Sequence, residues 1–194
     1  MRAAAVGING LSFSTLADCN PQFLSYLFNA SPRGVVENRE SFAPDGVWKR
    51  ILGDNTFEQL LSQNVLLSNI PLANPTYGRP SLNMQLISLQ NELEAMLETI
   101  STYSDKYVVV FSVNAYERDL KNKKDPCELM SLLDGYLRKA YELLDSYMFF
   151  SPYGFYENRY EPYGIYLSTV PRPSEEETIK LSQILDLIKM LGQP

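Results

Sequence analysis

A long apolar stripe between residues 81 and 104 constrains the fold more than any other feature of the chain. Its members alternate spacings of four and three residues, which places them on one side of an α-helix. They are Leu82, Leu86, Leu89, Leu93, Met96, Ile100 and Tyr103. Ile87 and Leu97 widen the stripe, and the flanking positions lack the opposed charges that select a coiled-coil partner. We therefore predict a core helix over about 81–104, with an intermolecular coiled coil as the alternative.

The residues after this stripe alternate between strand-like and helix-like patterns. The continuous apolar run at 107–113 indicates an interior strand that is covered on both faces. A helix is predicted at 125–147 and a second strand at 163–170. The last helix is expected to begin at Ser174, because Glu177 completes a capping box. This order predicts a mixed α+β fold, with a small β-sheet and several packed helices.

The first eighty residues are less regular. The apolar residues 3–13 predict a short strand or an extended arm. Region 32–80 is expected to be irregular, because prolines and glycines interrupt it. Within it, Thr56 and Gln59 have the spacing of a capping box, and 66–72 is apolar enough for a buried extended segment.

Length and composition describe an ordinary globular protein. The 194 residues fit a single domain, 1–194, and 45% of them are hydrophobic against 21% charged. The net charge of −6, with scattered Lys and Arg, argues against binding to nucleic acid or to an anionic membrane surface. The apolar runs are too short for a membrane span, and the N-terminal one is too short for a signal peptide. We therefore expect a cytoplasmic protein.

The two cysteines, Cys19 and Cys127, lie in different predicted elements and show no CxxC spacing. A secreted fold built on disulfides would carry more cysteines. We therefore expect both to be ordinary buried thiols.

The chain contains no histidine. This removes the usual general base near neutral pH, the Ser-His and Cys-His nucleophile pairs, and the commonest zinc ligand. Carboxylates are the first replacement to consider. Glu92, Glu94 and Glu98 lie off the apolar stripe, which is typical of a solvated helix face. Glu117 and Asp119 follow a predicted strand among lysines and arginines, which indicates a charged loop filled with water.

Cofactor motifs give no stronger indication. The glycines at 7 and 10 have neither the dinucleotide-binding spacing nor the lysine of a phosphate-binding loop. We therefore predict no catalytic residue, no metal ligand and no cofactor.

The segment 147–166 is almost half aromatic and contains the sequence Pro-Tyr-Gly twice. Each copy predicts a turn, so an aromatic-rich loop is expected here. The rings could cover the core, or they could form a contact surface, because Tyr and Arg are enriched in interface hot spots. The candidate partner-binding residues are Tyr153, Phe155, Tyr156, Arg159, Tyr160 and Tyr163.

These observations favour a non-enzymatic structural or adaptor subunit of a larger homo- or hetero-oligomeric protein assembly, with a virus particle or tail-type machine as one setting. Two alternatives stay open. One is a small carboxylate-dependent enzyme such as a glycan hydrolase, which needs two carboxyl groups about 5–10 Å apart in a cleft. The other is a monomeric module that binds a peptide or protein.

Overall fold

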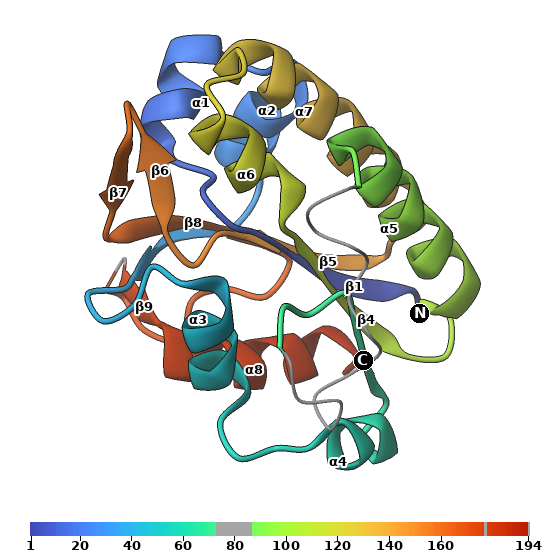
Figure 1. Cartoon of the computed structure of the whole chain (residues 1–194). Coiled ribbons are helices and arrows are strands. Elements are labelled where there is room, and N and C mark those ends of the chain that lie inside the picture. The colour runs from blue at the N-terminus through green and yellow to red at the C-terminus, as the bar shows by residue number, and fades with distance from the viewer. Residues whose placement is uncertain (73–86, 177, 194) are drawn as a thin grey trace.

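The computed structural model describes residues 1–72, 87–176 and 178–193. Within these residues, a seven-stranded mixed sheet is covered by helices on both faces (Figure 1). This confirms the predicted mixed α and β fold, and the sheet is larger than the small one expected.

Six of the seven strands run in the same direction. Their order is β3-β4-β1-β5-β8-β2-β9, and only β8 is antiparallel to its neighbours β5 and β2. The bounds are β1 Ala3–Ile8, β2 Arg33–Glu37, β3 Val65–Ser68, β4 Val108–Val113, β5 Ser146–Phe150, β8 Tyr163–Ser168 and β9 Thr178–Lys180. The C-terminal ends of the six parallel-running strands therefore share one edge of the sheet, which we call the carboxyl edge.

The helices form two layers, one on each face of the sheet (Figure 1). The first layer contains α1 Phe13–Cys19, α2 Gln22–Ala30, α5 Leu89–Tyr103, α6 Ala115–Lys121 and α7 Pro126–Leu143. The second contains α3 Pro44–Leu52, α4 Phe57–Ser62 and α8 Leu181–Leu191. Strand β1 is an interior strand, the third in the order of the sheet, and sends alternate side chains into the two cores, as expected for a strand covered on both sides.

Local sequence patterns located most of these elements. The predicted long helix begins at Leu89 in the described residues, where the Ser88 side chain caps it; the predicted part at 81–86 lies outside them. Its stripe residues Leu89, Leu93, Met96 and Ile100 are buried. The capping box of Thr56 and Gln59 starts α4 as predicted.

The last helix begins later than predicted. Ser174 lies outside any helix, its predicted capping partner Glu177 lies outside the described residues, and α8 starts at Leu181 because residues 178–180 pair with β2 as strand β9. The side chain of Gln183 accepts a hydrogen bond from the backbone N–H of Lys180 at 2.8 Å and caps the new start.

The aromatic segment folds mainly as strands instead of a loop. Its beginning belongs to the interior strand β5 and its end to β8. Between them, β6 Gly154–Tyr156 and β7 Arg159–Glu161 form an antiparallel hairpin. Glu157 and Asn158 connect the two strands with φ angles of 48° and 64°, which a tight two-residue hairpin turn requires.

The expectation of two free thiols was wrong. Cys19 and Cys127 form a disulfide that joins the end of α1 to the start of α7. The two residues are 108 positions apart in sequence, and their Cα atoms lie 5.2 Å apart in the fold. Only the packing of α1 against α7 brings them together, so sequence spacing could not reveal the pair.

Candidate functional site

A row of buried asparagines lies along the carboxyl edge. Asn9, Asn38, Asn69 and Asn114 are the residues that directly follow β1, β2, β3 and β4. Their exposed fractions are 0%, 2%, 3% and 4%. Ligands of open α/β sheets bind in the crevice outside the carboxyl ends of the strands. The corresponding position in this protein is therefore built from neutral amides.

The asparagines after β1, β3 and β4 form one hydrogen-bonded network. The side-chain N–H of Asn9 donates to Oδ1 of Asn114 at 2.9 Å, and the hydroxyl of Ser112 donates to the same oxygen at 2.8 Å. Asn114 in turn donates to the backbone carbonyl of Asn69 at 3.2 Å. Among the described residues, Oδ1 of Asn9 has no hydrogen-bond partner.

Glu92 belongs to this network, so its prediction as part of a solvated helix face was wrong. The side chain is 0% exposed. One carboxylate oxygen accepts the backbone N–H groups of Asn114 and Ala115 at 2.8 and 2.9 Å, and the other accepts Nδ2 of Asn69 at 3.0 Å. Burial raises the pKa of the Glu92 carboxyl, although these three hydrogen bonds act in the opposite direction.

Glu117 is also buried, with 4% of its surface exposed, rather than in the charged, water-filled loop that was expected. Its carboxylate accepts the hydroxyl hydrogens of Tyr153 at 2.8 Å and Tyr160 at 3.1 Å. The ammonium of Lys121 lies 3.3 Å from the same carboxylate. Gly10, with a φ of +87°, passes so closely that a Cβ atom there would lie 3.2 Å from Cβ of Glu117.

The charges of this cluster shift the pKa values of its members. Burial raises the pKa of Tyr153, and the nearby Glu117 carboxylate raises it further. For Lys121, partial burial lowers the pKa, but hydrogen bonding to Tyr160 and the charge of Glu117 outweigh it, and the pKa is raised. Asp119, 3% exposed and likewise predicted to be solvated, pairs instead with Arg118 at 3.0 Å and Lys124 at 3.3 Å.

Aromatic rings surround the Glu117 cluster. Phe42 stacks on Tyr160 with ring centroids 5.1 Å apart and planes 6° from parallel. Tyr153 meets both rings edge-on at 5.8 and 5.5 Å, and Phe155 meets Tyr160 at 5.1 Å. The β6–β7 hairpin therefore packs its inner aromatic side onto the cluster, next to the end of β1.

The structure places the six candidate partner-binding residues on this hairpin and at the start of β8, but at different depths. Tyr153 and Phe155 are buried, with exposed fractions of 0% and 6%. Tyr156 and Tyr160 are partly buried, and the hydroxyl of Tyr156 donates to Asp18. Arg159 and Tyr163 are exposed, and Arg39 donates to the hydroxyl of Tyr163 at 3.0 Å. A partner can therefore reach only the four residues that are not buried, Tyr156, Arg159, Tyr160 and Tyr163.

Sequence reasoning missed the asparagine row and the burial of the two glutamates. The available pattern was an asparagine directly after several apolar, strand-like runs, as in Val-Gly-Ile-Asn9 and Phe-Ser-Val-Asn114. The pattern becomes informative only when the strands are known to run in one direction.

Comparison with known proteins shows a similarity of fold. No family model matches the chain, and no curated protein matches it in sequence. An inactive form of murine ectonucleotide pyrophosphatase/phosphodiesterase 5 in complex with AMP aligns with a TM-score of 0.51 and 10% identity, over 82% of this chain and 59% of that chain. Phosphonoacetate hydrolase from Sinorhizobium meliloti 1021, in complex with phosphonoacetate, aligns with a TM-score of 0.51 and 9% identity, over 79% of this chain and 56% of that chain.

Both of these structures are of hydrolases, and at such low identity the similarity concerns the fold alone. The chain spans less than two-thirds of the length of either protein. Within the described residues, no helix is long and apolar enough to cross a membrane. The same part of the chain contains no group of three or more Cys, Asp or Glu side chains placed to hold a metal ion.

Proposed function

We propose that this protein is a non-catalytic binding domain, a structural or adaptor subunit that uses a hydrolase-type α/β fold to contact protein partners. The observation that carries the proposal is that the protein's own side chains fill the carboxyl edge of the sheet. The Glu117 carboxylate, which could otherwise face a ligand, is engaged by Tyr153, Tyr160 and Lys121. The rings of the hairpin pack around it and occupy the position where such sheets bind ligands.

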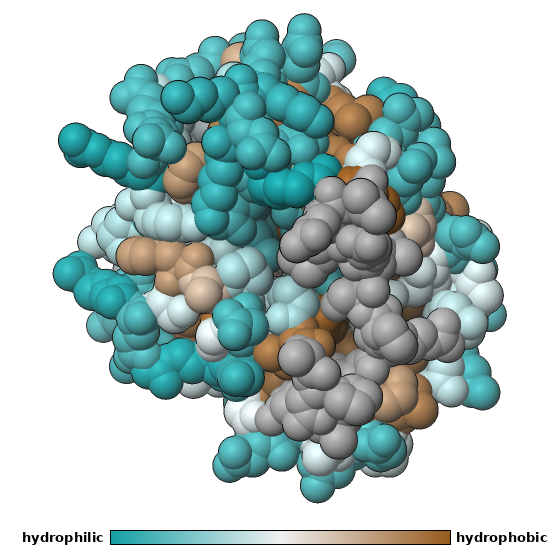
Figure 2. Space-filling model, viewed as in Figure 1, coloured by the Kyte–Doolittle hydropathy of each residue, from teal (hydrophilic) through white to brown (hydrophobic). Residues whose placement is uncertain are grey.

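The outer side of the same hairpin supports a protein contact. Arg159 and Tyr163 are exposed, and the guanidinium of Arg39 lies 5.9 Å from the Tyr163 ring. Tyrosine and arginine are the residues that most often dominate binding energy at interfaces. Hydrophilic side chains dominate the upper part of the face shown in Figure 2, over α1, α6 and α7. We therefore place the contact on the hairpin and the start of β8.

The first partner to test is a second copy of the same chain. Light scattering measures the mass of the purified protein in solution and shows whether it self-associates. We expect a defined oligomer that dissociates when Arg159→Ala and Tyr163→Ala are combined. The control is Tyr26→Ala, which removes a tyrosine that is 59% exposed on α2, away from the hairpin in sequence and in the fold. A monomer at all concentrations, unaffected by either variant, would overturn self-association through this surface.

A second candidate is a hydrolase acting on phosphorus esters. Two observations favour it: the two solved structures of similar fold reported above are hydrolases, and Glu117 with Lys121 and Tyr160 forms a charged cluster at the carboxyl edge. The assay is hydrolysis of phosphodiester, pyrophosphate and phosphonate substrates with and without divalent metal ions. Turnover that disappears in Glu117→Gln would establish this candidate and exclude the non-catalytic proposal. The glycan-hydrolase alternative has less support, because neither of the two similar structures reported above is of a glycan hydrolase.

The cytoplasmic location stays a prediction. The disulfide between Cys19 and Cys127 counts against it, because disulfides rarely persist in reducing compartments. The redox state of the two cysteines in protein isolated from its natural compartment would test this location.

A further inference from the structure

The disulfide between Cys19 and Cys127 lies in the wall of a hollow of about 390 Å³. The hollow is enclosed by the end of α1, by the segment from α6 to the first turn of α7, and by the β6–β7 hairpin. Its volume falls within the range of about 300–1,000 Å³ that small-molecule sites occupy. A covalent bond that thiols can open therefore borders a space that a small molecule can enter.

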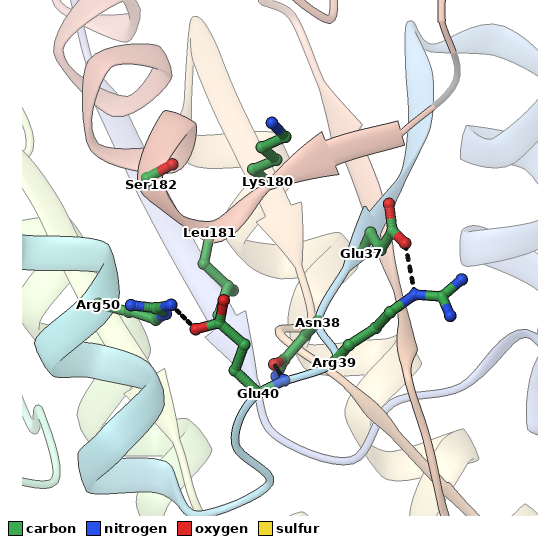
Figure 3. Close-up of a pocket in the computed structure, with 8 residues that line it drawn as sticks. All are labelled: Glu37, Asn38, Arg39, Glu40, Arg50, Lys180, Leu181 and Ser182. Atoms are coloured by element: carbon green, nitrogen blue, oxygen red, sulfur yellow. Dashed lines mark hydrogen bonds and ion pairs between the residues drawn. The ribbon is translucent and has the colours of Figure 1, made fainter.

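The hollow shown in Figure 3 has a different character. It lies at the ends of β2 and β9, where Arg39 is paired with Glu37 and Arg50 is paired with Glu40. The ammonium of Lys180 points away from both arginines. The polar groups there do not converge on one ligand, whereas both sulfur-bearing residues of the disulfide belong to the lining of the other hollow.

The two cysteines differ in exposure. Cys127 is exposed, in the first turn of α7. Cys19, the last residue of α1, is partly buried and packs against the apolar core. Thiol–disulfide exchange requires the attacking thiolate to reach one of the two sulfurs along the line of the bond. Access from the hollow therefore favours attack on Cys127.

The position of Cys127 on its helix has the opposite tendency, but a neighbouring carboxylate offsets it. The first turn of a helix favours a thiolate, which would make Cys127 the better leaving group and direct attack to Cys19. Asp125 places a negative charge at the same helix end, where it accepts the backbone N–H groups of Cys127 at 2.9 Å and Glu128 at 3.4 Å. Exposure therefore decides which sulfur reacts.

Charge does not select the ligand of this hollow. Two lysines and two carboxylates line it, namely Lys123, Lys124, Asp18 and Glu157. Opposite charges in equal number attract neither a cationic nor an anionic ligand preferentially. The disulfide itself reacts with a thiolate whatever charge the rest of the thiol carries. The class of ligand that this chemistry defines is a small thiol.

We propose that the Cys19–Cys127 disulfide is a site of reversible thiolation by a small thiol. A thiolate that enters the hollow forms a bond to Sγ of Cys127. The bond between the two protein sulfurs breaks, and its electron pair leaves on Sγ of Cys19, which takes up a proton. The protein then carries a mixed disulfide at Cys127 and a thiol at Cys19.

A second molecule of the same thiol completes the reduction. Its thiolate attacks the sulfur of the bound thiol, the disulfide of the small thiol departs, and Cys127 becomes a thiol. Two thiol molecules are oxidised to one disulfide, and the protein gains two electrons and two protons. The inference goes beyond the proposed docking function, because it concerns a covalent reaction and not a contact with a protein.

Reduction of the folded, oxidised chain by reduced glutathione tests the site at about pH 8, where part of the thiol is ionised. Samples are quenched with iodoacetamide at intervals, and their intact mass gives the fraction reduced. We expect a rate proportional to the glutathione concentration and unchanged by urea below the unfolding transition. A rate that increases with urea would overturn the inference, because the disulfide would then open only through unfolding.

Gly7→Ala is the matched variant for the same question. Its added carbon would lie 2.9 Å from the rings of Trp48 and Phe150, in the core on the other face of the sheet. The variant should raise the unfolded population about fivefold or more while leaving the hollow unaltered. We expect glutathione to reduce it at the rate of the unaltered chain, and a correspondingly faster reduction would contradict a native exchange site.

Two single-cysteine variants identify the sulfur that reacts. Cys19→Ser keeps only Cys127, and Cys127→Ser keeps only Cys19. With oxidised glutathione as the probe, Cys127 should form a mixed disulfide about tenfold faster than Cys19, because access limits the reaction. Intact mass measures the labelling, and thermal melting shows that each variant is folded. Equal rates at the two cysteines, or no labelling of either folded variant, would overturn the inference.

Discussion

Tyr153 and Glu117 form a hydrogen bond of 2.8 Å between the start of the hairpin and α6, and neither residue is more than 4% exposed. The pair joins segments that follow two different strands, β5 and β4, over the end of β1. A buried carboxylate that loses a donor keeps its desolvation cost without the compensating bond. The hydroxyl of Tyr153 should therefore contribute to the stability of the carboxyl edge, beside the donors of Tyr160 and Lys121.

We expect Tyr153→Phe to lower the free energy of unfolding by about 1–3 kcal/mol, because it removes the donor while retaining the ring. Urea denaturation followed by circular dichroism measures the change. Tyr26→Phe is the control, since Tyr26 is 59% exposed and should change stability by less than about 0.5 kcal/mol. Equal stability of Tyr153→Phe and the unaltered chain would show that the bond contributes nothing.

Glu92 predicts a dependence of stability on pH. Burial raises its pKa in the folded state, so the folded protein holds this proton more tightly than the unfolded chain does. The stabilisation that protonated Glu92 provides is fully present below the pKa that this carboxyl has in the unfolded chain. It is lost as pH rises through its pKa in the folded protein. Each unit of upward shift corresponds to about 1.4 kcal/mol.

The comparison that isolates this effect is with Glu92→Gln, which cannot ionise. The stability of the unaltered chain relative to this variant should fall as pH rises from about 4 to 7. Glu98→Gln, an exposed position on the same helix, should show no such trend. A relative stability that instead increases with pH would mean that the three hydrogen bonds outweigh burial and that the pKa of Glu92 is lowered.

The elements that sequence predicted are those decided by local pattern. The stripe of α5 and the apolar run of β4 each reflect burial along one continuous segment. The candidate site could not be predicted in this way, because segments far apart in the sequence form it. Glu92 lies beside the stripe residue Leu93, and the N–H groups at the start of α6, together with the side chain of Asn69, explain its burial. Strand β9 has three residues and forms because β2 is next to it.

The disulfide is the next testable feature. It closes a span of 108 residues, and a link of that length restricts the unfolded chain strongly. We expect reduction to lower the free energy of unfolding by about 2–4 kcal/mol. The double variant Cys19→Ser with Cys127→Ser should melt at the same temperature as the reduced protein and should not respond to dithiothreitol. Identical melting of the unaltered protein with and without reductant would show that the pair is not formed in solution.

Gly7 and Gly135 give opposite predictions for the same substitution. A Cβ atom at Gly7, in the central strand β1, would lie 2.9 Å from the rings of both Phe150 and Trp48. Those rings are fully buried and cannot move away freely, so Gly7→Ala should cost about 1–3 kcal/mol by overpacking. At Gly135, exposed in α7, no atom lies within 4 Å of the added carbon, and Gly135→Ala should stabilise the helix by about 0.5–1 kcal/mol.

Urea denaturation of both variants, followed by the fluorescence of Trp48, the single tryptophan, measures these changes. The Gly7→Ala variant should also shift the emission of the folded state, because the new methyl group contacts the indole ring directly. The Gly135→Ala variant should leave that emission unchanged. If both variants were equally stable, the close packing of Gly7 in β1 against Phe150 and Trp48 would be wrong.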